Sequence, residues 1–175
     1  MNKYAKVTIS GLICTGKTTL FWELQNQLFW PAYSASHFFR DYARTHKTSL
    51  DQAEEQNNKL TPEMDMHMKG LLETFPKIIV EGWMAGVMAS GRTDVLRVLL
   101  TCNERERIKR FALREKVTYK RARERVLARE QNLFTKLRQI YKRDDFLETK
   151  HYNLIIETTK IPLKSVVREV RRYLV

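Results

Sequence analysis

The sequence is poor in cysteine and in long apolar runs. Its 175 residues include only two cysteines, too few for a disulfide framework or a cysteine-rich zinc site. The longest apolar runs extend over a few residues, far short of the roughly 20 that cross a bilayer. The start, MNKYAKVTIS, has no apolar stretch of the kind that precedes a signal-peptide cleavage site. We therefore expect a cytoplasmic protein with no membrane partner.

Acidic residues are scarce beside basic ones, and the excess is unevenly placed. Lys and Arg number 32 against 20 Asp and Glu, a net charge of +12. From Glu104 to Arg143 there are fifteen basic and five acidic residues, a net of +10. The basic segment lacks an aromatic ladder on which bases could stack, which argues against a nucleic-acid partner. We expect it to meet a smaller phosphate-bearing ligand.

Short apolar runs alternate with helical patterns along the whole chain. The spacing predicts helices over residues 17–28 and 118–141, and shorter ones near 38–43, 103–114 and 163–174. Further helix starts are predicted at Ser49, from a capping-box pattern, and at Thr61, with Pro62 in the first turn. Strands are predicted at residues 6–10, 32–36, 77–82, 95–100 and 152–156. Such alternation predicts a three-layer α/β/α sandwich around a five-stranded parallel sheet.

Polar residues or glycine stand at or just past the predicted strand ends. In an open parallel sheet, ligands bind beyond the carboxyl ends of the strands. We therefore expect these residues to converge on one cleft: Gly11, Ser34, Glu81 and Thr101.

The first of these strands runs into a phosphate-binding loop. GLICTGKTT matches the pattern G-x4-G-K-[ST] between a strand and a helix. The amides of such a loop cradle phosphates, and the lysine neutralises the β- and γ-phosphates. We expect Thr18 to ligate Mg2+ and Glu81 to orient its water shell. The residues expected to bind ATP are Gly11, Thr15, Gly16, Lys17, Thr18 and Thr19.

Arginines recur at helical spacing in the basic segment. Arg107, Arg110 and Arg114 occupy one face of a predicted helix, and Arg125 and Arg129 are four apart on the next. Phosphoryl transfer needs such cations to offset charge on the moving group. The expected catalytic residues are Lys17, Arg110, Arg114 and Arg129. The two helices predict a mobile lid, near residues 107–136, that excludes water from the reaction.

Nearly end to end, the chain resembles the archaeal-type cytidylate kinases, a branch of the nucleoside monophosphate kinases. The phosphate loop is common to the whole superfamily; the resemblance to this family is carried by further segments in matching order. These are Ser34 to Arg40, Glu81 to Gly86, the lid residues Arg107, Arg110 and Arg114-Glu115, the pair Arg129-Glu130, Tyr141 to Asp144, and Tyr152 to Leu154.

The resemblance implies a single kinase domain over residues 1–175, with an acceptor-binding region near 34–75. It implies ATP- and Mg2+-dependent phosphorylation of CMP or dCMP without a protein nucleophile. Ser34 would lie near the base or sugar of the acceptor, Arg40 would bind its phosphate, and Asp65 would face its base or ribose. A monomer is expected. A homodimer is the alternative, because exposed parts of Phe21-Trp22 or Phe29-Trp30 could form a subunit contact.

Departures from the family pattern lie on the acceptor side. Trp83 replaces an arginine that would contact the acceptor, and it could stack on a base or pack in the core. Lys136 replaces an arginine, which keeps the charge but loses the bidentate fork. Ser36 and His37 replace a glycine and an acidic residue.

Three alternatives therefore stay open: a kinase for another nucleotide or small molecule, a nucleic-acid-binding protein, and a non-catalytic ATP-binding protein.

Overall fold

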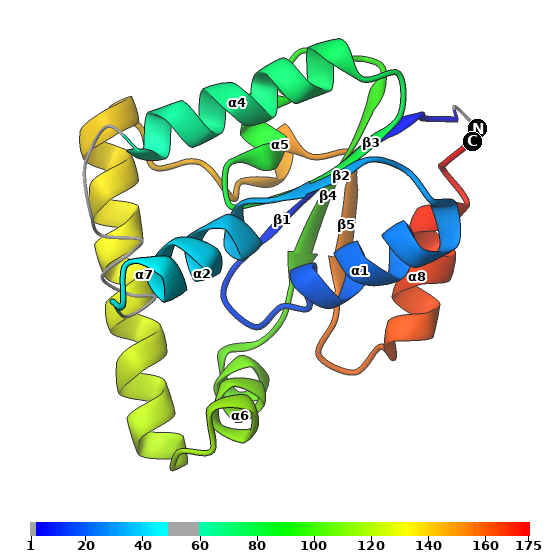
Figure 1. Cartoon of the computed structure of the whole chain (residues 1–175). Helices are drawn as coiled ribbons and strands as arrows, with labels where there is room; N and C mark the ends of the chain where they lie inside the picture. Colours follow the sequence, from blue (N-terminus) through cyan, green and yellow to red (C-terminus); the bar gives the residue numbers. More distant parts are fainter. Residues whose placement is uncertain (1–2, 49–59) are drawn as a thin grey trace.

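In the computed structural model, which describes residues 3–48 and 60–175, five parallel strands form a sheet with helices on both faces (Figure 1). The strands are β1 (Lys6–Gly11), β2 (Ala32–Ser34), β3 (Ile78–Glu81), β4 (Val95–Thr101) and β5 (Leu154–Glu157). The α-helices are α1 (Lys17–Leu28), α2 (Ala35–Thr45), α4 (Leu60–Thr74), α5 (Ala85–Met88), α6 (Glu104–Glu115), α7 (Tyr119–Tyr141) and α8 (Leu163–Arg171). A 3-10 turn, η1 (Thr149–His151), precedes β5. The expected five-stranded α/β/α sandwich is confirmed.

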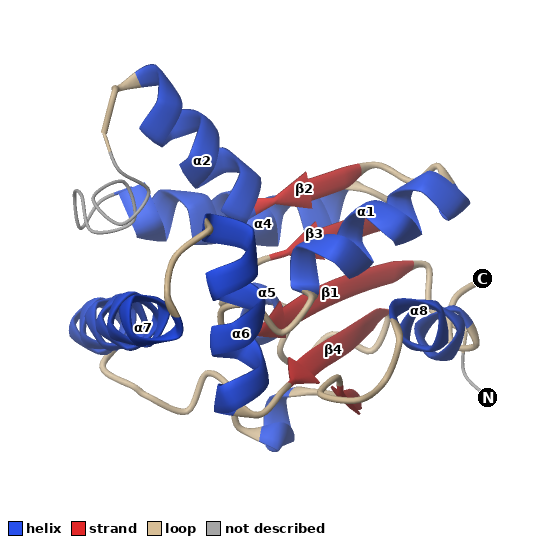
Figure 2. Ribbon diagram, turned by 90° about the horizontal axis from the view of Figure 1, so that it is seen from below, coloured by secondary structure: helices blue, strands red, loops and turns tan. Residues whose placement is uncertain are grey.

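The strand order β2-β3-β1-β4-β5 places β1 at the centre of the sheet. All the pairings are parallel, and in register Lys6 lies opposite Ile78 of β3 and Val95 of β4. The carboxyl ends of the strands point toward α6 (Figures 1 and 2). The loops after β1, β3 and β4 therefore open on the same edge, where ligands bind in parallel sheets.

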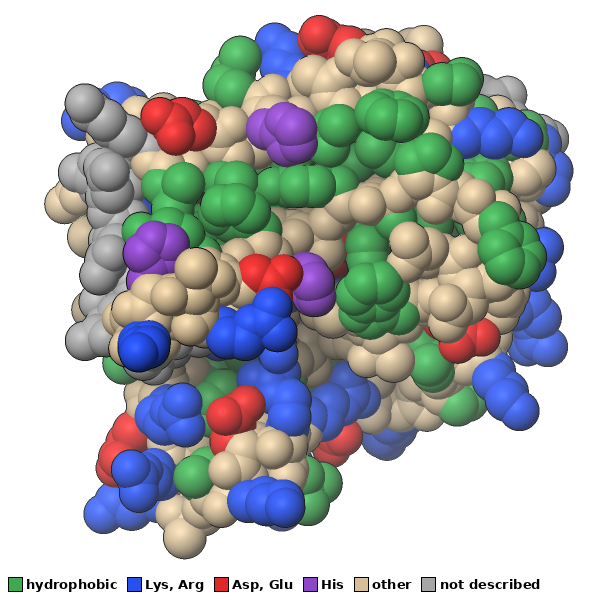
Figure 3. Space-filling model, viewed as in Figure 1, with side chains coloured by type: hydrophobic (Ala, Val, Ile, Leu, Met, Phe, Trp, Pro, Cys, Tyr) green, Lys and Arg blue, Asp and Glu red, His purple; other side chains and the backbone are tan. Residues whose placement is uncertain are grey.

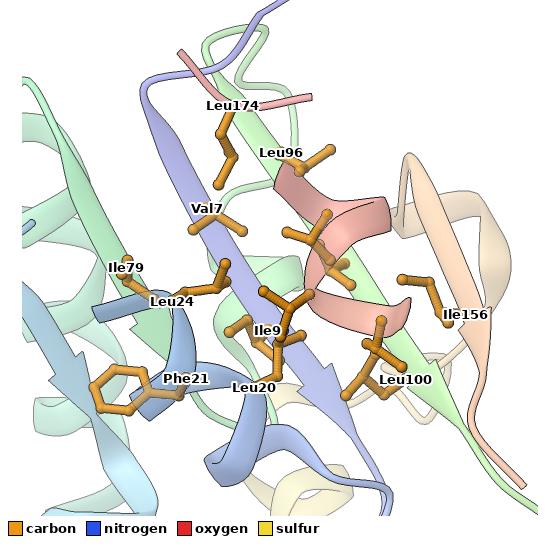
Figure 4. Close-up of a cluster of buried hydrophobic side chains, with 14 of the residues drawn as sticks. Val7, Ile9, Leu20, Phe21, Leu24, Ile79, Leu96, Leu100, Ile156 and Leu174 are labelled. Carbon is orange, nitrogen blue, oxygen red and sulfur yellow. The ribbon is translucent and has the colours of Figure 1, made fainter. Parts of the chain in front are cut away.

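The sheet separates two apolar cores, because successive side chains of a strand point to opposite faces. Ile79 belongs to the core beneath α1 and α8, whereas Ile78 and Val80 belong to the core beneath α4 and α5. In the first core, side chains of α1 pack onto those of β1 (Figure 4). Burial on both faces explains why the strands read as nearly continuous apolar runs.

A third, smaller core lies between α6, α7 and the loop after β1. Ile13 of this loop packs with Ile108 and Phe111 of α6 and with Ala122 and Val126 of α7. The two helices therefore form a unit that rests on the phosphate-binding loop. Within the residues that the structure describes, no helix is long and apolar enough to span a bilayer.

Several predicted helix starts are confirmed by their capping bonds. Asn103 accepts a hydrogen bond from the Glu106 amide at 2.8 Å, and Thr118 accepts one from the Arg121 amide at 3.3 Å. These side-chain caps satisfy amides that the first helical turn leaves without a partner. The predicted bounds of α1, residues 17–28, are also those of the structure.

Other predicted bounds were wrong. α2 begins at Ala35 instead of Phe38, because Ser34 ends β2 and caps the helix through the His37 amide. α4 already includes Leu60, so Thr61 lies inside the helix, where Pro62 is tolerated in the first turn. Strand β5 begins at Leu154 rather than at residue 152, and α8 ends at Arg171 rather than at 174. Helix α5 was not predicted, and the capping box at residues 49–52 lies outside the described residues.

The close packing of α5 yields a prediction about stability. A Cβ added at Gly86 would lie 2.3 Å from Cε1 of Tyr152, a buried ring whose hydroxyl donates to the Phe146 carbonyl at 2.6 Å. We expect Gly86→Ala to lower the free energy of unfolding by about 1–3 kcal/mol through overpacking. Gly70→Ala on α4 is the matched control, because no atom lies within 4 Å of an added Cβ there. Urea unfolding that gave both variants the same stability would contradict the packing argument.

Candidate active site

The loop between β1 and α1 has the backbone of a phosphate cradle. Gly11 has a φ of 151°, and a Cβ there would lie 2.4 Å from the Leu100 carbonyl oxygen. Gly16, with a φ of 102°, is the N-cap of α1, and Cys14 has a φ of 60°. This path brings the loop to the amino end of α1, where amides and the helix dipole attract anions. Thr18 is half-buried and Thr19 exposed in the first turn of that helix.

Lys17 is buried at the head of α1. Its Nζ donates to the Leu12 carbonyl at 2.9 Å and lies 5.4 Å from the ring centroid of Trp83. Burial lowers the pKa of Lys17, and the charge of Glu81 acts in the opposite direction. A cation held at low exposure beside a phosphate cradle interacts strongly with a phosphate group that enters it.

Glu81, at the end of β3, is also fully buried. Its carboxylate accepts hydrogen bonds from Ser34 at 2.5 Å and Ser36 at 2.9 Å. The predicted meeting of the β2 and β3 ends is thereby confirmed. Within residues 3–48 and 60–175, no group of three or more His, Cys, Asp or Glu side chains could hold a metal by itself. The hydroxyl of Thr18 and the carboxylate of Glu81 are nevertheless oxygen donors of the kind that Mg2+ takes, because this ion keeps several waters and receives further ligands from substrate phosphates.

A buried ion pair joins the phosphate loop to helices α6 and α7. Arg107 of α6 pairs with Glu130 of α7 at 2.5 Å, and both side chains bond the backbone of Ile13. The Ile13 amide donates to Glu130 at 3.1 Å, and Arg107 donates to the Ile13 carbonyl at 3.2 Å. The Nε of Arg107 is buried without a hydrogen-bond partner. We refer to Arg107, Glu130 and the Ile13 backbone as the loop clamp.

Their spacing predicted that the three arginines of α6 would lie together on one face of the helix. In the structure each of them has a different environment. Arg107 is buried in the clamp, so this residue does not face an open phosphate site. Arg110 donates to the Thr158 carbonyl at 2.7 Å and to Glu106 at 3.1 Å, beside the loop. Arg114 is exposed, pairs with Glu115 and lies over the Phe111 ring. Carboxylate neighbours therefore reduce the repulsion between these guanidinium groups.

The charges of Arg129 of α7 and of Arg114 of α6 act on ionisable groups of the loop. The charge of Arg129 lowers the pKa of Lys17, and both arginines act to lower that of Cys14, against the larger raising effect of burial. The role expected for Arg110, Arg114 and Arg129 in transfer stays a prediction. Lys and Arg side chains gather over α6 and α7 on the face shown in Figure 3.

A first pocket adjoins the loop on the side of α8. Thr15, Gly16 and Thr19 form one wall together with Arg110 of α6. The opposite wall is largely apolar and consists of Leu100, Ile161, Pro162, Leu163 and Val166. Thr158 also lines this pocket, and its hydroxyl lies 2.9 Å from the carbonyl oxygen of Thr15 and 2.9 Å from that of Thr101. The pocket combines an apolar slot with the phosphate cradle.

A second pocket lies on the other side of the loop, between α2, α4 and α7. It is lined mainly by apolar groups, with Asp65 and Trp83 among them: Ala35, Ser36, Phe39, Thr61, Asp65, Met68, Trp83, Met84, Leu133 and Leu137. Asp65 is 4% exposed and accepts a hydrogen bond from the Tyr141 hydroxyl at 2.5 Å. Burial raises the pKa of Asp65 to about 6, and the bond from Tyr141 opposes this shift. A buried carboxyl in an apolar pocket is a typical functional group.

The remaining expected acceptor residues, Ser34, Arg40 and Lys136, are not among those that line the second pocket. Arg40 is exposed on α2, and Lys136 is buried on α7. Ser34 is buried and engaged with both Glu81 and the His37 amide. Their roles toward an acceptor stay predictions.

Four side chains of the site were given no role in the sequence analysis: Ser36, Glu130 and Tyr141, which were named only as parts of family segments, and Thr158, which was not named. One of them left a readable signal, since Ala122, Val126 and Glu130 are four residues apart on the buried face of α7. An acidic residue on an apolar stripe needs a buried partner, and Arg107 is that partner. The other contacts join distant segments, such as Tyr141 to Asp65, and no local pattern indicates them.

Comparisons with known proteins agree on a phosphate-loop kinase. Residues 7–131 match a family model described as an AAA domain. The chain is 30% identical to the cytidylate kinase of Ignicoccus hospitalis, over 96% of this chain and 98% of that one. It is 26% identical to the cytidylate kinase of Methanosarcina mazei, over 89% and 88%. A shikimate kinase from Acinetobacter baumannii superposes with a TM-score of 0.63 at 16% identity, over 97% and 92%, which shows a shared fold.

The loop clamp yields a prediction about stability and ATP binding. Glu130→Ala would leave Arg107 charged and buried without its carboxylate, at a cost of about 3–5 kcal/mol. We expect Glu130→Gln to cost less but to raise the KM for ATP, because the Ile13 contact weakens. The control is Glu115→Gln, which removes the exposed partner of Arg114 and should cost at most about 1 kcal/mol. Urea unfolding and steady-state kinetics test this, and equal effects at residues 115 and 130 would contradict it.

The raised pKa of Asp65 yields a prediction about pH. Because the pKa of Asp65 is raised from 3.8 to about 6, the folded protein binds this proton more tightly than the unfolded chain does. Stability contributed by this carboxyl is therefore lost as pH rises through this window. The Asp65→Asn variant has no titrating group at this position and does not lose this stability. Its free energy of unfolding relative to that of the wild type should therefore rise by up to about 3 kcal/mol between pH 4 and pH 7. Unfolding curves at both pH values measure the difference, and a gain in the opposite direction would contradict the assignment.

Proposed function

We propose, because the chain belongs to the archaeal-type cytidylate kinase family, that it transfers the γ-phosphoryl group of ATP to CMP or dCMP. The observation that carries the proposal is the position of the second pocket. Trp83 lines this pocket and also lies over Lys17 of the phosphate loop. A group bound there is therefore next to the phosphates that the loop would hold.

ATP would occupy the first pocket and the cradle. The loop amides and Lys17 would bind its β- and γ-phosphates, with Thr15, Gly16 and Thr19 around them, and the apolar wall near Leu163 would receive its base. Mg2+ would be bound by Thr18 and, through water, by Glu81. When bound, the ion neutralises charge on the transferring phosphates.

The second pocket supports a pyrimidine acceptor with an exocyclic amine. Phe39 and Trp83 offer aromatic surface to a planar base. Above about pH 6 the Asp65 carboxylate can accept a hydrogen bond from the N4 amine of cytosine. Uracil presents an oxygen at that position, whose lone pairs would face the carboxylate. Ser34, or its neighbour Ser36, would meet the base or sugar, and Arg40 and Lys136 would bind the acceptor phosphate.

Transfer needs no protein nucleophile. An oxygen of the acceptor phosphate forms the new bond to the γ-phosphorus while the bond to the β,γ-bridging oxygen breaks. Lys17 and the arginines at 110, 114 and 129 would offset the charge that spreads over the moving group. Positioning the two substrates in line supplies much of the rate enhancement in such reactions.

The domain organisation follows from this assignment. We propose a single kinase domain with an acceptor-binding region near residues 34–75 and a lid near 107–136, whose closure would exclude water. We propose a cytoplasmic monomer, because both sites are built from one chain and its substrates are cytoplasmic metabolites. Exposed Trp22 and Phe29 are the surface to inspect if a dimer is found.

Another acceptor is the second candidate, and Trp83 in place of an arginine favours it. The indole removes a charged contact to an acceptor phosphate and adds apolar surface. A small molecule without that phosphate would then fit the pocket better than a nucleotide does.

An acceptor panel tests the proposal. Purified protein with ATP and Mg2+ is assayed for ADP release on CMP, dCMP, UMP, dUMP, AMP and GMP, and on shikimate and gluconate as small-molecule acceptors. We expect CMP and dCMP to be phosphorylated at least about fivefold more efficiently than UMP, because one hydrogen-bonded base contact discriminates by about 1–3 kcal/mol. Lys17→Ala is the control and should abolish transfer. The proposal fails if CMP and dCMP give no ADP above this control while another acceptor does.

A further inference from the structure

Trp83 occupies the junction between the two candidate substrate sites. It follows β3 by two residues and is half-buried. Its ring centroid lies 5.4 Å from Nζ of Lys17, which the phosphate loop presents to ATP. The same indole lines the second pocket together with Asp65. Among the described residues, Trp83 is the one that lines this pocket and also places its aromatic ring beside the Lys17 ammonium group.

The position of the indole is set by neighbours from the lid and the loop. Phe134 of α7 meets it edge to face, with ring centroids 5.5 Å apart and planes at 85°. Trp83 also packs against the small core that contains Ile13 of the loop and Phe111 of α6. The ring of Trp83 is therefore packed at once against α7, against the small core that contains Ile13 of the loop, and along the second pocket.

The contact with Lys17 is a cation–π interaction in a place with little water. The ring face attracts the ammonium without offering a hydrogen bond that would compete with phosphate oxygens. Lys17 has a long side chain, and its ordering costs conformational entropy when ATP binds. A ring that holds Nζ near the loop lowers this cost, provided that the ring is itself held in place.

We propose that Trp83 couples the two sites: an acceptor that packs against the indole fixes it, the fixed indole orders Lys17, and ATP then binds more tightly. This inference rests on the proposed assignment of the two pockets to ATP and an acceptor, but not on the identity of the base. Coupling of this kind is reciprocal, so ATP must tighten acceptor binding by the same factor. Trp83 is thus a positioning residue that acts on phosphate binding through Lys17.

Calorimetric titrations measure the coupling. The Kd of a non-hydrolysable ATP analogue with Mg2+ is determined with and without saturating CMP, and the Kd of CMP with and without the analogue. We expect each ligand to tighten the other about fivefold in the wild type, within the usual range of coupling factors. In Trp83→Leu the ratio should fall to about one, and in Trp83→Phe to an intermediate value, since a smaller ring remains.

Phe39→Leu is the matched control. Phe39 lines the same pocket, but among the described residues the aromatic ring beside Lys17 is that of Trp83. Loss of the Phe39 ring should therefore weaken CMP binding, while the coupling ratio stays near fivefold. A role of Trp83 in packing alone would change single affinities or stability without changing the ratio. The proposal is overturned if Trp83→Leu keeps the wild-type ratio, if Phe39→Leu abolishes it equally, or if the wild type shows no coupling.

A second measurement leaves the side chain in place and covers the case in which Trp83→Leu does not fold. The chain has three tryptophans, so protein labelled with 5-fluorotryptophan gives three 19F resonances. The Trp83 resonance is assigned by its loss in Trp83→Phe. Its chemical shift should change when either ligand is added alone. A resonance whose chemical shift stays the same on addition of either ligand contradicts the proposal.

Failure of the coupling and failure of the cytidylate assignment are distinguishable. If CMP does not bind, the same titrations are made with the acceptor that the panel identifies, and coupling through Trp83 is still required. If that acceptor binds without coupling, the role of Trp83 is refuted while the kinase assignment stands. If none of the acceptors binds, both are refuted.

Discussion

The buried pair of Arg107 and Glu130 is the interaction on which the active-site geometry depends. Both side chains bond the backbone of Ile13, one residue before Cys14, which has a left-handed backbone. A phosphate loop must hold such a conformation before its ligand arrives, and a fixed backbone reduces the cost of binding. The clamp joins that loop to α6 and α7 at once. The cost of burying two charges is offset here by their short contact and by hydrogen bonds to peptide groups.

Because Arg107 is held in the clamp, the basic residues of α6 and α7 lie in two different environments. Arg107 and Glu130 hold the backbone of Ile13 in place, whereas Arg110 donates to the Cys14 carbonyl at 3.4 Å and the charge of Arg129 acts on Lys17. Removing a structural arginine and removing a phosphate-binding arginine would both lower activity. Only the first would also lower the free energy of unfolding by several kcal/mol, so stability distinguishes the two classes.

Much of the fold could be predicted from the sequence, because its signals are local. The strand runs, the caps at Asn103 and Thr118, and the phosphate-loop pattern each depend on a few neighbouring residues. The sheet edge where Ser34 meets Glu81 followed from the rule for parallel strands. What could not be predicted depends on contacts between distant segments. The spacing of Arg107, Arg110 and Arg114 correctly predicted that they belong to one helix. That Arg107 is buried depends on the packing of α7 against that helix, which the spacing does not indicate.

Trp83 stands where the family resemblance leads us to expect an arginine, and this changes the electrostatics beside Lys17. A guanidinium beside Lys17 would repel it and would need an anion from a substrate to be stable there. An indole attracts the same ammonium and is stable in the apolar surroundings of Phe134 and Ile13. Without that arginine, the positive charge that binds the acceptor phosphate would have to come from other residues, and Arg40 and Lys136 are the cations proposed for this role. With the two pockets assigned as proposed, the substitution would exchange a direct electrostatic contact with the acceptor for an aromatic wall shared by both sites.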